Sequence, residues 1–198
     1  WSSDVCSSDL SIKKLSDAMK KAVFSDIDYQ LLSDNSSITL KQMKSFDKTD
    51  EKNLRLYNDK AYKIIQADKA FDCGLYEEKI CKNGVVRKVK SKTIIPQKII
   101  ITFSRKMMEY QRYIRNRQIE RAKKILKNLD PDTYKKGPND VTRFIKRKSK
   151  TTSGEEVTEL YEIDQSVIEE EEKYDGFYAI ATNLDDPAKD IIEISSNR

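Results

Sequence analysis

Histidine is absent from this chain of 198 residues, and cysteine is scarce. The three cysteines are Cys6, Cys73 and Cys81, and thiols without any histidine are a poor set of zinc ligands. Free thiols are the preferred interpretation, and a disulfide between Cys73 and Cys81 is the alternative. No apolar run approaches the roughly 18 residues that a membrane helix needs. These absences argue against a zinc protein and a membrane protein, and we expect a cytoplasmic location.

The first ten residues lack the pattern of a folded segment. They repeat Ser-Ser-Asp and resemble a sequencing adapter translated in one frame, so residues 1–10 are set aside from functional reasoning. A natural disordered tail is the alternative. The chain also has no initiator methionine, and we expect a fragment that is truncated at both ends.

Charge is abundant and unevenly distributed. Charged residues make up 36% of the chain, which is above the usual quarter. Residues 79–150 hold 23 basic and 5 acidic residues, whereas residues 151–198 hold 3 and 14. A basic middle beside an acidic flank predicts that one surface meets a polyanion, and nucleic acid is the obvious candidate.

Hydrophobic patterning indicates a mixture of helices and strands. Residues 11–24 have helical spacing behind a possible Ser11 cap. Asn83-Gly84 marks a hairpin between strands at 76–81 and 85–89. Further strands are expected at 93–103 with an edge or bulge at Pro96, at 157–163 and at 177–182, while residues 54–70 are ambiguous but favour hairpin strands.

The clearest element is a long helix over residues 104–128. Its apolar stripe is expected to comprise Met107, Tyr110, Ile114, Ala122, Ile125 and Leu129. The other faces are rich in arginine and lysine, which form either a solvated surface or a contact with a DNA backbone. The basic run at 146–150 is likewise a solvated loop or a phosphate contact. The candidate DNA-binding residues are Arg112, Arg115, Lys123, Lys146, Arg147 and Lys148.

Acidic residues near the C-terminus do not predict a metal site. The four glutamates at 169–172 occupy consecutive helical positions, which point around the axis and cannot converge on one ion. Asp17, Asp175 and Asp190 lack partner carboxylates, and Asp175 is expected to shape the turn at Asp175-Gly176. No catalytic residue and no metal ligand is therefore assigned.

The last 25 residues carry a recognisable arrangement. The run from Tyr174 reads Tyr-Asp-Gly-Phe-Tyr-Ala-Ile-Ala-Thr-Asn, and a short acidic turn with Pro187 follows. A helix with Ile191, Ile192 and Ile194 on its apolar side then ends at Arg198. This resembles the last strand and the start of the glutamate-bearing helix of bacterial insertion-sequence transposases of the DDE class, in the insertion-sequence-four superfamily. Arg198 matches the arginine of the family's Tyr-x-x-Arg-x-x-x-Glu motif, whereas Ser195 replaces the tyrosine.

The resemblance implies an α+β fold. Residues 11–173 would form a β-rich insertion with a long basic helix, and residues 174–198 would form the final strand of an incomplete ribonuclease-H-like DDE domain and the start of the next helix. Because its neighbouring strands would lie upstream of Ser11, we expect Phe177, Tyr178 and Ile180 to lack part of their burial.

The resemblance also implies a chemistry for the intact protein. It would bind double-stranded DNA at transposon ends and carry out cleavage and strand transfer with Mg²⁺ or Mn²⁺ held by three carboxylates. None of these carboxylates lies in residues 11–198 on this alignment, so the fragment itself would be inactive and bind no cofactor. A dimer is one assembly the resemblance allows. The alternative hypothesis is a non-catalytic, basic nucleic-acid-binding module.

Overall fold

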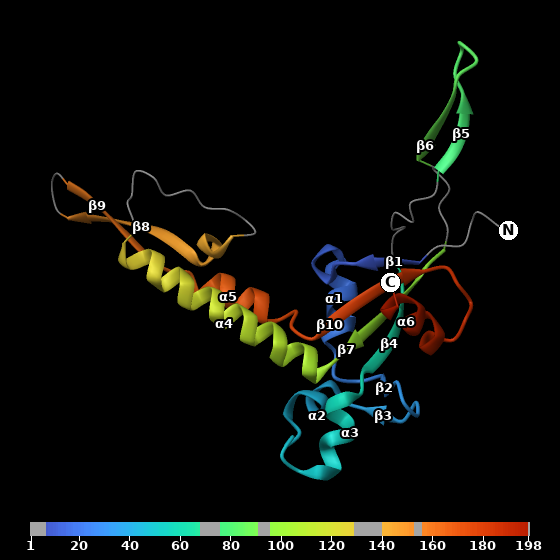
Figure 1. The fold of residues 1–198 in the computed structure, drawn as a ribbon, viewed down its shortest axis with the longest axis horizontal. Helices are drawn as coiled ribbons and strands as arrows, with labels where there is room; N and C mark the ends of the chain where they lie inside the picture. Colours follow the sequence, from blue (N-terminus) through green and yellow to red (C-terminus); the bar gives the residue numbers. More distant parts are fainter. Residues whose placement is uncertain (1–6, 68–75, 91–95, 129–139, 153–155, 198) are drawn as a thin grey trace. The chain divides into compact units, whose positions relative to one another are not determined.

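The computed structural model describes residues 7–67, 76–90, 96–128, 140–152 and 156–197 (Figure 1). The chain divides into two compact units: unit 1 comprises residues 1–105 and 176–198, and unit 2 comprises residues 106–175. Helices and sheets occur together, and every described strand pairing is antiparallel, so the α+β class is confirmed.

A six-stranded antiparallel sheet organises unit 1. Its strands run in the order β1-β10-β7-β4-β2-β3, so the last strand in sequence lies next to a strand from the middle of the chain. Residues far apart in sequence therefore share one core. The bounds are β1 (Ser7–Leu10), β2 (Tyr29–Leu31), β3 (Ser37–Ile38), β4 (Ala61–Gln66), β7 (Lys98–Phe103) and β10 (Phe177–Thr182).

Strand β7 lies inside the sheet, between β10 and β4, and both of its faces are apolar. Ile99, Ile100, Ile101 and Phe103 have no exposed surface. Such a continuous apolar run is typical of a strand covered on both sides. The predicted strand at 93–103 is confirmed for residues 98–103. Pro96 lies exposed before it and outside the strand, where its missing N–H costs no ladder hydrogen bond, and residues 91–95 lie outside the described part.

Helix α6 (Ala188–Ser196) buries its apolar side against the sheet. Ala188, Ile191 and Ile192 form one cluster with Ile100 and Ile180. The expectation that Ile194 joins this side is wrong, because its side chain is 49% exposed. Pro187, rather than an aspartate, occupies the N-cap position, and no side chain caps the helix.

The burial of β10 differs from the expectation. The strand has the predicted bounds, but Phe177 and Ile180 are only 8% and 1% exposed. The prediction is wrong for these two residues because β7 and β1 flank the strand and α6 covers Ile180, whereas Tyr178, named in the same prediction, is 41% exposed. Residues 7–10, set aside from the sequence analysis, pair with β10 through backbone positions opposite residues 179–182.

The helices of unit 1 are shorter than the sequence patterns indicated. The predicted helix at 11–24 is a 3-10 turn followed by a helix that begins after Ser16, whose hydroxyl accepts a hydrogen bond from Met19 N. Part of the predicted hairpin at 54–70 is helical before β4 begins. The bounds are η1 (Ile12–Lys14), α1 (Asp17–Phe24), α2 (Leu40–Ser45), η2 (Glu51–Asn53) and α3 (Leu54–Asn58).

The predicted hairpin at Asn83-Gly84 is confirmed. Strands β5 (Tyr76–Ile80) and β6 (Val86–Lys90) form a two-stranded sheet of their own. Gly84 has a φ of +75°, a backbone conformation that residues other than glycine rarely adopt.

Unit 2 is built on one long helix, α4 (Arg105–Lys127), which matches the predicted helix within a residue at each end. The strand predicted at 157–163 is also present. The basic run at 146–150, interpreted as a loop, instead lies in a strand. The bounds are η3 (Val141–Phe144), β8 (Ile145–Thr152), β9 (Glu156–Ile163) and α5 (Gln165–Glu172). Among the described helices of both units, none is sufficiently long and apolar to cross a membrane.

Candidate nucleic-acid interface

The buried face of α4 sets which of its cations are exposed. Ile119 and Ala122 pack with Phe144, Ile145 and Ile168 in the core of unit 2. The other buried positions of the helix are Met108 and Arg115. The buried stripe is therefore rotated from the predicted one. Of the predicted stripe, Ala122 is buried, Ile114 is half-buried, Met107, Tyr110 and Ile125 are exposed, and Leu129 lies outside the described residues.

Arg115 is a buried ion-pair partner. Its side chain is 5% exposed, as is that of Asp175. The guanidinium donates from Nη1 and Nη2 to the two carboxylate oxygens of Asp175 at 2.8 and 2.5 Å. These hydrogen bonds raise the pKa of Arg115 above its ordinary value, so its guanidinium is charged. The prediction that Arg115 contacts DNA is wrong, because burial removes it from the surface. Asp175 likewise does more than shape a turn.

A second arginine, Arg143 of η3, bonds to both α4 and α5. Arg143 donates to Glu171 Oε1 at 2.7 Å and to Gln118 Oε1 at 2.7 Å, and its guanidinium lies 4.0 Å from the centre of the Phe144 ring. This network ties α4, η3 and α5 together. It could not be seen in the sequence, because 25 and 28 residues separate Arg143 from its partners.

The outward side of α4 carries the available positive charge. We define the α4 basic face as Lys106, Arg117, Arg121, Lys124 and Lys127, all of which are exposed. Their spacing follows the helical repeat along an element about 34 Å long at 1.5 Å per residue. The nearby Glu120 is paired with Lys123 at 2.8 Å, which leaves the face strongly positive.

Two exposed tyrosines lie among these cations. Tyr110 and Tyr113 are 59% and 58% exposed, and the Arg117 guanidinium lies 5.8 Å from the Tyr113 ring centre. A phenol can donate a hydrogen bond to a phosphate oxygen. Tyr110 was expected in the core, and its exposure adds a polar donor to the α4 basic face.

The remaining candidate residues do not form one surface. The Arg112 side chain is 47% exposed and donates to Asp175 at 3.3 Å, at the margin of the buried pair. Lys123 and Lys146 are half-exposed and paired with Glu120 and Glu162. Lys146 and the exposed Arg147 occupy successive positions of β8, so they point to opposite faces. Lys148 lies in β8, but its side chain is outside the described part.

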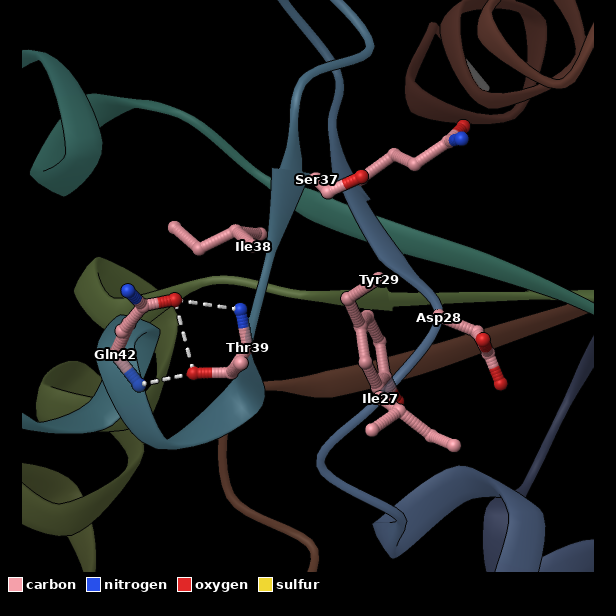
Figure 2. A pocket seen from close by; sticks show the side chains of 8 residues that line it. Ile27, Asp28, Tyr29, Ser37, Ile38, Thr39 and Gln42 are labelled. Atoms are coloured by element: carbon pink, nitrogen blue, oxygen red, sulfur yellow. Dashed lines mark hydrogen bonds between the residues drawn. The ribbon is translucent and has the colours of Figure 1, made fainter.

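Unit 1 contains an open hollow of about 390 Å³ beside β2 and β3 (Figure 2). Thr39 and Gln42 at its rim form a reciprocal capping box: Gln42 N donates to Thr39 Oγ1 at 3.1 Å, and Thr39 N donates to Gln42 Oε1 at 2.9 Å. Figure 2 shows Thr39 and Gln42 hydrogen-bonded to each other at the side of the hollow. The side chains of Thr39 and Gln42 therefore cap helix α2.

The described residues do not supply a site for the divalent cation that a DDE enzyme would require. No group of three or more acidic, cysteine or histidine side chains converges in the described ranges. Asp17 is exposed, Asp175 is committed to Arg115, and Asp190 lies on the exposed side of α6.

No family model matches the chain, and no curated protein or solved structure matches it either. Functional inference therefore depends on the residues and on their arrangement.

Proposed function

We propose that the chain is part of a DNA transposase of the DDE class and that the α4 basic face contacts the phosphate backbone of duplex DNA. The family part is supported by the Asp-Gly-Phe-Tyr strand, the acidic turn and Arg198. Placing β10 in a ribonuclease-H-like sheet belongs to the same proposal. DNA cleavage and strand transfer would be properties of the intact protein, with the metal-binding carboxylates outside these residues.

The α4 basic face is the single observation that carries the DNA contact. Net charge does not carry it, because unit 2 holds 16 basic and 15 acidic residues. Several acids are used internally, by Arg115, Arg143 and Lys146. The outward row of α4 remains positive, and each phosphate that it neutralises releases counterions. Such contacts fix position on a duplex but read no sequence.

A fluorescence-anisotropy measurement with labelled duplexes tests this contact. The variant Lys106→Gln, Arg117→Gln, Arg121→Gln and Lys124→Gln removes four exposed charges while keeping good helix formers. The control Lys13→Gln, Lys21→Gln, Lys41→Gln and Lys52→Gln removes four exposed charges from unit 1. We expect the first variant to lose about tenfold or more in affinity and the control to lose much less. Equal losses would reject the α4 basic face as the contact.

The gene sequence beyond the codon for Arg198 tests the family part. A glutamate at the fourth position after Arg198 is expected if the transposase motif continues. Unrelated sequence there would favour the alternative, a non-catalytic basic module whose DNA contact is the same α4 basic face. The two parts of the proposal can therefore fail separately.

A further inference from the structure

The hairpin β5–β6 has a well-defined tip. Cys81 N donates to Val85 O at 2.8 Å, and Gly84 N donates to Cys81 O at 2.8 Å. Asn83 Oδ1 accepts from Val85 N at 3.3 Å. These bonds and the positive φ of Gly84 hold a tight turn, so the side chains beside it are presented in a fixed arrangement.

The tip exposes apolar side chains that would ordinarily be covered. Ile80 and Val86 are cross-strand partners and are 77% and 54% exposed, and Val85 is 48% exposed. Ile80 is the most exposed large apolar side chain in the described part of the chain. An isolated two-stranded hairpin is only marginally stable in water, and most of the apolar surface of Ile80 and about half of that of Val86 stay in contact with solvent. A partner surface that covers the tip would explain their presence.

The charges around the tip indicate what that partner is. Lys79 lies directly opposite Arg87, and both are exposed. Like charges in a cross-strand pair repel, so this pair costs stability in the free protein. Lys82 at the turn adds a third exposed cation, whereas Lys88 lies opposite Glu78. A polyanion would relieve the repulsion, whereas an apolar protein surface would leave these charges unpaired.

We propose that the tip of β5–β6 enters a groove of duplex DNA, with Ile80 and Val86 on one face of the ribbon wedged against a base step. Lys79 and Arg87 lie on the opposite face, where they and Lys82 at the turn contact phosphates of the groove walls. Two-stranded ribbons bind DNA in either the major or the minor groove. Apolar side chains inserted between base pairs partly unstack them and kink the duplex. The inference rests on the proposed function for DNA binding, but it uses unit 1 rather than α4 and adds distortion of the DNA.

The test uses the full chain and duplexes that carry 2-aminopurine at several positions, whose fluorescence rises when the base unstacks. We expect protein binding to raise the emission about twofold or more at one or more positions. The variant Ile80→Ser with Val86→Ser should lose this rise while retaining salt-dependent binding. The control Ile27→Ser with Ile194→Ser changes two residues of unit 1 that are 62% and 49% exposed and should behave as the parent protein.

A second pair of variants separates the charges from the apolar wedge. Lys79→Gln with Arg87→Gln removes the like-charged pair, so we expect weaker DNA binding together with unchanged or higher thermal stability. Lower thermal stability would show that the pair is structural and would count against the proposal.

The outcomes are distinguishable from failure of the α4 contact. Duplex binding without any rise in emission overturns the hairpin inference and leaves the α4 proposal standing. Absence of duplex binding overturns both. Sedimentation tests self-association through the tip. If the free chain self-associates and the variant with Ile80→Ser and Val86→Ser does not, the tip binds a second copy of the chain. That result overturns the groove inference.

Discussion

The two units are held together in different ways. In unit 1, three successive isoleucines of β7 and the α6 cluster are excluded from water on a six-stranded sheet. In unit 2, a small apolar core is supplemented by the buried Arg115 and the half-buried Arg143, each paired with an acid from a following part of the chain. The acidic flank of the sequence is therefore a partner of the basic middle. The comparison shows that charge in unit 2 is partly structural, whereas the cations of the α4 basic face are exposed.

The largest expected effect concerns the buried pair of unit 2. Asp175→Ala leaves Arg115 charged and buried, and its Nε already has no hydrogen-bond partner. Breaking a buried pair from one side costs about 3–5 kcal/mol. We expect a loss of that size in the free energy of unfolding from denaturant titration, with faster amide exchange in α4.

Two companions sharpen this measurement. Glu120→Gln breaks an exposed pair on the same helix and should cost no more than about 1 kcal/mol. Arg115→Met combined with Asp175→Leu removes both charges and should recover most of the loss. If Asp175→Ala were as mild as Glu120→Gln, the claim that ion pairs hold unit 2 would be wrong.

The corresponding change in unit 1 removes apolar volume. Ile180 is 1% exposed between β7 and α6, and Ile180→Ala should cost about 2–5 kcal/mol through lost burial and a residual cavity. Ile194→Ala on the exposed side of α6 should stay within about 0.5 kcal/mol. Equal effects in thermal unfolding would contradict the burial assigned to α6.

A smaller effect is expected at the capping box of α2. Thr39→Ala removes the acceptor for Gln42 N and should destabilise unit 1 by about 1 kcal/mol. Thr39→Ser keeps the hydroxyl and is the matched control. If both variants had the same denaturant midpoint, the claim that the Thr39 hydroxyl stabilises unit 1 would be wrong.

The pH dependence of unit 1 provides the most subtle comparison. Burial raises the pKa of Tyr29 above its ordinary value of 10.0. The unfolded chain then loses this proton first, so stability present below about pH 10 falls as the pH rises above it. Tyr29→Phe should flatten this alkaline decline, although it also removes the hydrogen bond to Val23 O. A decline of identical slope in both proteins would contradict the assignment.

Sequence patterns predicted elements better than their faces. The strand at Phe177–Thr182 and the hairpin at Asn83-Gly84 follow from local apolar runs and turn residues, and both are present. Helix α4 has two apolar stripes, one through Met107 and Ile125 and one through Met108 and Ile119. Which stripe is buried depends on Phe144, Ile145 and Ile168, which are distant in sequence.

The candidate site shows the same limit. Arg115 looks like a surface cation in the sequence, and only its distant partner Asp175 makes burial possible. Net charge by segment was also misleading, because pairing across unit 2 cancels most of it. Arg117, Arg121 and Lys124 were not among the candidate DNA-binding residues, although their spacing along α4 follows the helical repeat and all three are exposed.

The salt dependence of duplex binding tests the central claim most directly. The claim is that the α4 basic face supplies the phosphate contacts, so the logarithm of the binding constant should fall linearly with the logarithm of salt concentration, by about 0.9 per contact. For the variant in which Lys106, Arg117, Arg121 and Lys124 are each replaced by Gln, we predict a slope shallower by about 3–4. The same slope in this variant and in the parent protein would contradict the account.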